Sequence, residues 1–188
     1  SGARITGSIN GGGGTNLLVF ETSTGNDTIA VTGGSVTINS VSQSYLNIAT
    51  LRVNSNGGAD GVTVNPSGSN LPSTIEINSG DGDDALVVNL AAGVTTTIVV
   101  DGGAPSASDS LTVNGTAGND VININGSQLT YGSMAVTLKG IESLSVKGGA
   151  GADQITLSGN PGSATVELLG EGDNDTIGVT YPVTANNL

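Results

Sequence analysis

One pattern recurs along the 188 residues of this chain and limits its fold more than any other feature. A glycine-rich turn leads to an aspartate, then to one further residue, then to a short run of apolar and β-branched side chains. The fullest copy is residues 147–157, KGGAGADQITL, and residues 80–88, GDGDDALVV, repeat it with two glycines. Weaker copies occupy residues 25–29, 58–62, 108–111, 118–122 and 173–177, and residues 14–18 carry Asn16 in place of the acid. Such recurrence predicts a repeat protein built from stacked units.

Composition favours a narrow core of small side chains. Only 36% of the residues are hydrophobic and 2% aromatic, which is too little for a wide globular core, while 11% charged residues is too few for a disordered chain. Apolar runs recur about every 11 to 12 residues between Gly, Asn, Ser or Pro corners, and no window has the 3.6-residue period of a helix. We therefore expect an all-β fold of about sixteen short strands.

The sequence from Gly148 to Ile155 reads G-G-x-G-x-D-x-U, which resembles the nonapeptide of the RTX, or haemolysin-type, calcium-binding repeat proteins. The resemblance implies a parallel β-roll in which aspartates and turn carbonyls hold Ca²⁺. In that family the nonapeptides follow one another directly, whereas strands without the motif separate the acids here. This chain is similar to a degenerate relative with longer turns, and we expect a right-handed parallel β-solenoid.

A longer period divides the chain into two tandem units. Residues 24–31 resemble residues 117–124, and Asp60 matches Asp153 at the same spacing. We predict a single domain, residues 1–188, composed of units at about 1–93 and 94–188 with eight strands each. Two strands per turn would stack the units in register, which is the arrangement we favour, whereas three strands per turn would rotate the second unit by one face.

With two strands per turn, the motif acids are sorted by edge. Asp60, Asp84 and Asp109 are expected to stack in consecutive turns, Asp153 and Asp175 do the same, and Asp27 and Asp120 each lie alone on the opposite edge. The extra carboxylates near these stacks complete the set of candidate metal ligands, which is Asp60, Asp81, Asp83, Asp84, Asp109, Asp153, Glu171, Asp173 and Asp175.

Calcium is the cation that these residues suit, because the chain contains no His and no Cys and offers only oxygen ligands. Ca²⁺ takes roughly six to eight oxygens, so two stacked corners would have to share one ion. The alternative is that each aspartate caps its own turn by accepting backbone hydrogen bonds. Both interpretations remain open from sequence.

Charge limits the possible partners. The net charge is −12, and the only basic residues are Arg4, Arg52, Lys139 and Lys147, which argues against nucleic acid and anionic membrane surfaces. No apolar run is long enough for membrane insertion. The acidic, cysteine-free composition is typical of a secreted bacterial protein at the cell surface, and any export signal is expected to have been removed or to lie outside this sequence.

These features favour a non-enzymatic structural or adhesive module, such as a spacer or surface-layer component of a larger secreted protein. A polysaccharide-degrading enzyme is an alternative, although His and Cys are absent and the few cations are scattered. A polysaccharide- or ice-binding face is another, because a threonine-rich row is expected on one sheet, at Val19, Thr37, Thr63, Val87, Thr112, Thr137, Thr156 and Gly178.

The ends of the repeat indicate a further alternative. The regular spacing of expected strands begins as early as Ile5, and only residues 180–188 follow the last expected strand. Without covering caps, the terminal turns would expose unpaired backbone groups. We therefore expect the chain to contact copies of itself, or neighbouring repeats, end to end, and to form an extracellular fibre or part of a repeat array.

Overall fold

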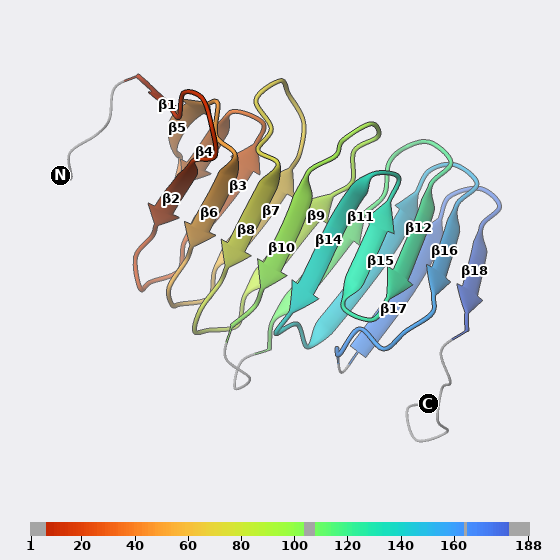
Figure 1. The fold of residues 1–188 in the computed structure, drawn as a ribbon. Coiled ribbons are helices and arrows are strands. Elements are labelled where there is room, and N and C mark those ends of the chain that lie inside the picture. The colour runs from red at the N-terminus through yellow and green to blue at the C-terminus, as the bar shows by residue number, and fades with distance from the viewer. Residues whose placement is uncertain (1–6, 104–107, 164, 181–188) are drawn as a thin grey trace.

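The computed structural model describes residues 7–103, 108–163 and 165–180, and within them the chain forms eighteen strands and no helix. The all-β expectation is confirmed, and Figure 1 shows the strands side by side along one axis. No helix of the described residues could cross a membrane. The strands are β1 (Ser8–Asn10), β2 (Leu17–Glu21), β3 (Thr28–Thr32), β4 (Ser35–Ile38), β5 (Val41–Leu46), β6 (Thr50–Asn54), β7 (Gly61–Asn65), β8 (Thr74–Asn78), β9 (Ala85–Asn89), β10 (Thr97–Asp101), β11 (Ser110–Asn114), β12 (Val121–Asn125), β13 (Gln128–Tyr131), β14 (Met134–Lys139), β15 (Ser143–Gly149), β16 (Gln154–Leu157), β17 (Thr165–Glu171) and β18 (Thr176–Val179).

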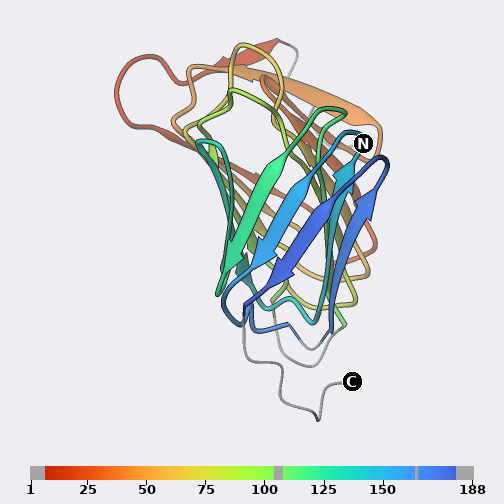
Figure 2. The same cartoon turned by 90° about the vertical axis from the view of Figure 1, so that its right-hand side faces the viewer.

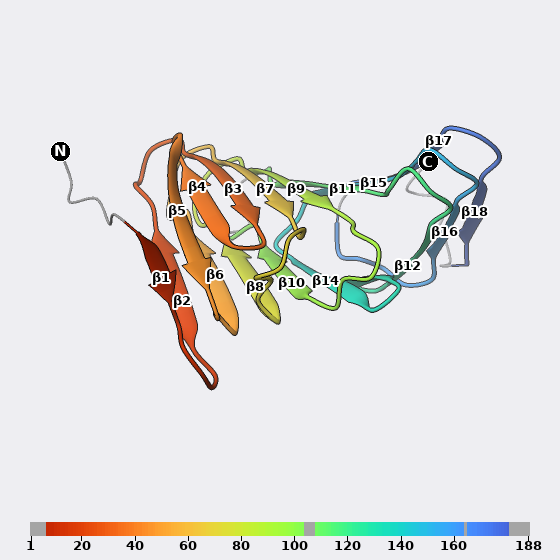
Figure 3. The same cartoon turned by 90° about the horizontal axis from the view of Figure 1, so that it is seen from above.

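The strands form two nine-stranded sheets, which Figure 3 shows as two layers. The first sheet has the order β1-β5-β4-β3-β7-β9-β11-β15-β17, and the second has the order β18-β16-β12-β13-β14-β10-β8-β6-β2. From β6 to β11 the chain changes sheet after every strand, so β6 pairs with β8 and β7 with β9, both in parallel. Consecutive strands of this stretch therefore belong to alternate sheets, as the two-strand arrangement predicts.

Two antiparallel triplets interrupt this alternation. Strands β3, β4 and β5 all lie in the first sheet, and β12, β13 and β14 all lie in the second. Two-residue loops join them. Asn39 and Ser40 both have positive φ, 48° and 69°, and Gly126 has φ 59°, which is the backbone that tight hairpins require. The expected count of sixteen strands is wrong because β5, with the sequence VSQSYL, and β13, with the sequence QLTY, contain too few apolar residues to be recognised as strands.

The triplets also overturn the expected in-register stacking of eight-strand units. Strands β10 to β18 follow the same order of crossovers and hairpins as β1 to β9, so each half has nine strands. Within each half the chain alternates between the two sheets, and a triplet stays in one sheet and so counts once. The resulting number of alternating segments is odd. The second half consequently begins on the opposite sheet, and β2 of the second sheet corresponds to β11 of the first. Ile5, the expected centre of the first strand, lies outside the described residues.

The core is a column of small apolar side chains between the layers. Most five-residue strands bury their second and fourth positions, as in β8, where Ile75 is 1% exposed and Ile77 is fully buried. The register places Ile98 and Val100 of β10 directly beside them. Fully burying one such side chain stabilises the folded state by about 1.5 to 3 kcal/mol. Each strand adds its buried pair to the same continuous core.

Candidate functional site

The motif acids that precede strands of the first sheet lie side by side. The backbone N–H of Asp60 donates to Oδ1 of Asp84 at 2.8 Å, and the N–H of Asp84 donates to Oδ1 of Asp109 at 2.8 Å. The expected stack of these three residues in consecutive turns is confirmed.

This stack continues in both directions. The N–H of Asp27 donates to Oδ1 of Asp60 at 2.7 Å, and the N–H of Asp109 donates to Oε2 of Glu142 at 2.9 Å. The prediction that Asp27 lies alone on the opposite edge is wrong, because the β3-β4-β5 triplet keeps the chain in the first sheet. We call the row Asp27, Asp60, Asp84, Asp109 and Glu142 the first ladder.

A second ladder runs beside the second sheet and consists of Asp120, Asp153 and Asp175. The N–H of Asp120 donates to Oδ1 of Asp153, and the N–H of Asp153 donates to Oδ1 of Asp175, both at 2.9 Å. The expected pairing of Asp153 with Asp175 is confirmed. Asp120 lies on the opposite edge from Asp60, as expected. The expectations that it stands alone and that Asp153 and Asp175 share an edge with Asp60 are wrong, because the β12-β13-β14 triplet shifts the later strands to the other sheet.

Inner members of the ladders are buried carboxyls with one unused oxygen. Asp60, Asp84, Asp109 and Asp153 are at most 2% exposed, and Oδ2 of each has no hydrogen-bond partner. Burial raises the pKa of Asp60 and Asp84, with a smaller contribution from neighbouring carboxylates. For Asp109, burial and then repulsion from Asp84 and Glu142 outweigh the Asp84 N–H bond and raise the pKa to about 6.

The first acid of each ladder is held differently. Oδ2 of Asp27 accepts the N–H and the hydroxyl of Ser23 at 3.0 and 2.9 Å, and Thr116 makes the same two kinds of bond to Asp120. Burial by itself would raise the pKa of Asp27, but bonds from Asn39 and Ser23 lower it overall. These two acids therefore cap their own turns, as the capping interpretation predicts.

A small residue five positions before most of these acids is a feature that the sequence analysis missed. A Cβ built on Gly148 would lie 2.2 Å from Oδ2 of Asp153, and one on Gly170 would lie 2.1 Å from Oδ2 of Asp175. The acid thus folds back over the residue that opens its corner. Alignment on the acids and on Asn16 would have revealed the position, which holds Gly11, Thr22, Ser55, Ser79, Gly115, Gly148 and Gly170.

Asn16 shows what the unused oxygen lacks. Its Nδ2 donates to the carbonyl of Gly11, five residues earlier, at 3.0 Å. At the corner of the second ladder that Gly148 opens, the unpartnered Oδ2 of Asp153 and the carbonyl of Gly170 both approach the Cβ position of Gly148, at 2.2 and 2.7 Å. A carboxylate therefore brings an acceptor towards carbonyls where asparagine brings a donor. A proton or a cation would relieve that opposition.

The extra carboxylates predicted as metal ligands mostly join one turn to the next. Oδ1 of Asp83 accepts the N–H of Ser108 at 2.9 Å, and Oδ2 of Asp173 accepts the N–H of Gly151 at 3.1 Å. A carboxylate oxygen of Glu171 lies 3.8 Å from Nζ of Lys147, and Asp81 is linked to its neighbouring turn through its backbone. Among the described residues, no group of three or more carboxylates is arranged around one ion position.

Asparagines form a second set of ladders at the ends of the strands. Nδ2 of Asn78 donates to Oδ1 of Asn54 at 2.8 Å, and Nδ2 of Asn114 donates to Oδ1 of Asn89 at 2.8 Å. Asn89 in turn donates to Asn65. The recurring fifth-position Asn of the strands was visible in sequence, but its role as a link between turns depends on the register.

The predicted threonine-rich row on one sheet is wrong. Thr63, Val87 and Thr112 do lie side by side on the first sheet, but Thr37 stands across the β3-β4 hairpin. The remaining members, Val19, Thr137, Thr156 and Gly178, lie on the second sheet, because each triplet changes the sheet on which later strands fall.

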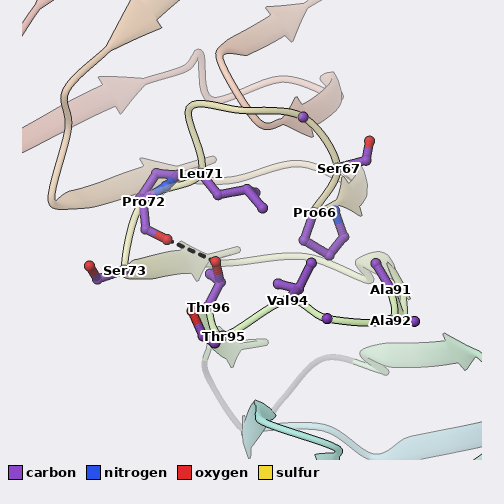
Figure 4. Close-up of a pocket in the computed structure, with 12 residues that line it drawn as sticks. Pro66, Ser67, Leu71, Pro72, Ser73, Ala91, Ala92, Val94, Thr95 and Thr96 are labelled. Atoms are coloured by element: carbon purple, nitrogen blue, oxygen red, sulfur yellow. Dashed lines mark hydrogen bonds between the residues drawn. The ribbon is translucent and has the colours of Figure 1, made fainter.

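A surface hollow of about 480 Å³ lies between the loops that follow β7 and β9. Figure 4 shows Pro66, Leu71 and Val94 around it and the bond from Oγ1 of Thr96 to the carbonyl of Pro72, 2.9 Å. Its lining mixes apolar side chains with polar backbone groups and hydroxyls, and it carries no titratable side chain. Among the described residues, neighbouring carboxylates lie side by side in the ladders and not around this hollow.

Comparison with known proteins identifies no relative. No family model matches this chain, and neither a curated protein nor a solved structure does.

Proposed function

We propose that this chain is a non-enzymatic structural module, a right-handed parallel β-solenoid that serves as a rigid spacer or matrix component of a larger secreted protein at the bacterial cell surface. The observation that supports this most is the use of the motif acids. Each inner acid accepts the backbone N–H of the neighbouring turn's acid. The side chains best suited to chemistry, the buried carboxylates, therefore link consecutive turns.

Rigidity along the axis is the property such a module needs. Neighbouring turns are joined by backbone pairing in both sheets, by the acid ladders and by the asparagine ladders. Nine strands in each sheet extend it by about 38 Å at roughly 4.8 Å per strand. Stability in such a stack is a sum of contacts between neighbouring turns, so more turns give more length without a larger core.

Hydrogen exchange tests this proposal directly. The amides of Asp60, Asp84 and Asp153 should be among the slowest to exchange, because each is buried and donates to the next acid. Amides of the exposed loop at residues 67–70 supply the comparison. Exchange of the ladder amides as fast as that loop would mean that the turns are not held together by the ladders.

We also propose Ca²⁺ as the cation that neutralises the inner carboxylates where they are ionised. Oδ2 of Asp60, Asp84 and Asp109 would hold calcium in the first ladder and Oδ2 of Asp153 would do so in the second, each with carbonyl oxygens of the small corner residues. Bound calcium would supply positive charge to oxygens that otherwise face other acceptors. The resemblance of residues 148–155 to calcium-binding repeats supports the same assignment.

Calcium and protons should compete for these oxygens. Above pH 6, calcium should raise the melting temperature relative to a chelator, and the gain should shrink at pH 5. Asp84→Asn should reduce the gain, because it removes a carboxylate between two others. Glu167→Gln, an exposed acid on β17, is the matched control. Equal melting temperatures with calcium and with chelator at pH 7.5 would contradict the calcium proposal and leave the spacer proposal in place.

A further inference from the structure

We propose that the two ends of this molecule are the two halves of one interface, at which a second copy of the chain adds β1 and β2 beside β17 and β18 of the first. The inference rests on the proposed structural function and specifies its partner. It concerns only strands within the described residues.

The sheet order makes the two ends compatible. β1 and β17 are the outermost strands of the first sheet, and β2 and β18 are the outermost strands of the second. Figures 1 and 2 show β17 and β18 at one end, and β1 and β2 at the other. One half alone would offer mismatched sheets, because each half shifts the chain to the opposite sheet. Two halves restore the match, so each outer strand finds its counterpart in the same sheet.

The junction between the halves inside the chain is a template for this contact. There β8 pairs with β10 and β9 pairs with β11, both in parallel. Because the strand order repeats, β8 and β9 correspond to β17 and β18, and β10 and β11 correspond to β1 and β2. In the template Leu86 is opposite Leu111 and Val88 is opposite Val113. The transferred register places Ile177 opposite Leu18, and Val179 opposite Phe20, of the second copy.

Exposure at the ends fits this register. Ile177 and Val179 are 45% and 49% exposed, whereas Leu86 and Val88, their counterparts at the junction, are 3% and 1% exposed. Leu18 and Phe20 are only partly buried, whereas the corresponding Leu111 and Val113 are fully buried. Each end therefore presents an apolar pair that the internal junction covers, and joining the ends would cover both.

The polar groups of the junction also have counterparts at the ends. At the junction the N–H of Asp84 donates to Oδ1 of Asp109, and the corresponding groups are the N–H of Asp175 and Oδ1 of Asn16. Oδ1 of Asn16 accepts the N–H of Ala49 on its inner side, so this bond would form once the Asn16 side chain turns towards the second copy. Sheet edges that avoid pairing usually carry charges or proline, yet β2 and β18 together carry only Glu21.

Engineered cysteines test the register, because the chain contains none of its own. The double variant Gly178→Cys/Val19→Cys places thiols at positions equivalent to the adjacent pair Val87 and Thr112. Mild oxidation should link copies into a ladder of covalent multimers. Gly178→Cys/Val99→Cys is the control, since Val99 lies in the middle of the second sheet, and it should not give the ladder. Equal linking in both variants would overturn the proposed register.

A proline variant tests the contact without engineered thiols. The N–H groups of Thr176 and Thr180 point inward, to the carbonyls of Asp153 and Leu157, so alternation along the strand directs the N–H of Val179 to the open edge. Val179→Pro should remove an outward donor and leave the internal pairing intact. In sedimentation up to millimolar concentration, the unmodified chain should associate and this variant should remain monomeric.

The control for this variant is Val121→Ser, which changes a 51% exposed residue of β12 away from both ends and should associate like the unmodified chain. A monomer at every concentration would refute the interface. If the ladder amides of that monomer remain protected from exchange, the spacer proposal survives and only the partner is wrong. Loss of the protection would instead contradict the spacer proposal.

Discussion

Replacing Asp109 by asparagine should stabilise this protein at neutral pH in the absence of calcium. The carboxyl is fully buried, Oδ1 accepts the N–H of Asp84, and Oδ2 has no partner. Asparagine keeps the acceptor, removes the buried charge and adds a donor. Asn16 demonstrates that such a donor finds a backbone carbonyl at this kind of corner.

The magnitude follows from the pKa of Asp109, which burial raises from 3.8 to about 6. This difference corresponds to about 3 kcal/mol between the two protonation states. Because the folded chain binds the proton more tightly than the unfolded chain, the contribution to stability is fully present below about pH 3.8 and is lost as pH rises through about 6. For a chain of this length, about 3 kcal/mol is roughly 6 to 12 °C in melting temperature.

Thermal unfolding followed by circular dichroism, with a chelator, measures this effect. The difference between Asp109→Asn and the unmodified chain should be small near pH 4 and should grow above pH 6, in favour of the variant. Glu167→Gln controls for removing one negative charge from an acidic protein. The reasoning would be refuted by a difference that does not change with pH, or by an asparagine variant as unstable at pH 7.5 as Asp109→Ala.

Three other substitutions test separate parts of the fold. Gly148→Ala should lower the free energy of unfolding by about 1 to 3 kcal/mol in urea denaturation, because the new Cβ would lie 2.2 Å from Oδ2 of Asp153. Gly118→Ala is the control and should be nearly neutral, because its new Cβ would have no atom closer than 3.8 Å. Asn89→Ala should cost about 1 to 2 kcal/mol by removing its bonds with Asn65 and Asn114, and Asn70→Ala in the exposed loop at residues 67–70 should not. Tyr45→Phe should cost about 1 kcal/mol, because the buried hydroxyl donates to the carbonyl of Thr32. An unchanged urea midpoint for Tyr45→Phe would contradict this contribution.

Local features of the sequence correctly predicted much of the candidate site. The stacking of Asp60, Asp84 and Asp109 followed from their positions before every second strand, in a stretch where the chain only crosses between sheets. The same reasoning failed for Asp27 and Asp120, since an antiparallel triplet follows each of them. The small residues that open the corners, such as Gly148, could have been found by aligning the acids, but their contact with Oδ2 of the acid could not.

The sequence by itself determined that this chain is all-β and that acids and glycines recur at its corners, because both depend on the period of apolar residues and on local turn chemistry. Only the tertiary structure decided which sheet each strand joins. An apolar alternation of two residues buries the same side chains whether the next strand turns back in its own sheet or crosses to the other. That choice depends on a two-residue loop such as Asn39 and Ser40, and on which neighbouring strand has an open edge. The choice moved the second ladder to the opposite sheet and, with two triplets in the chain, placed matching strands at the two ends of the molecule.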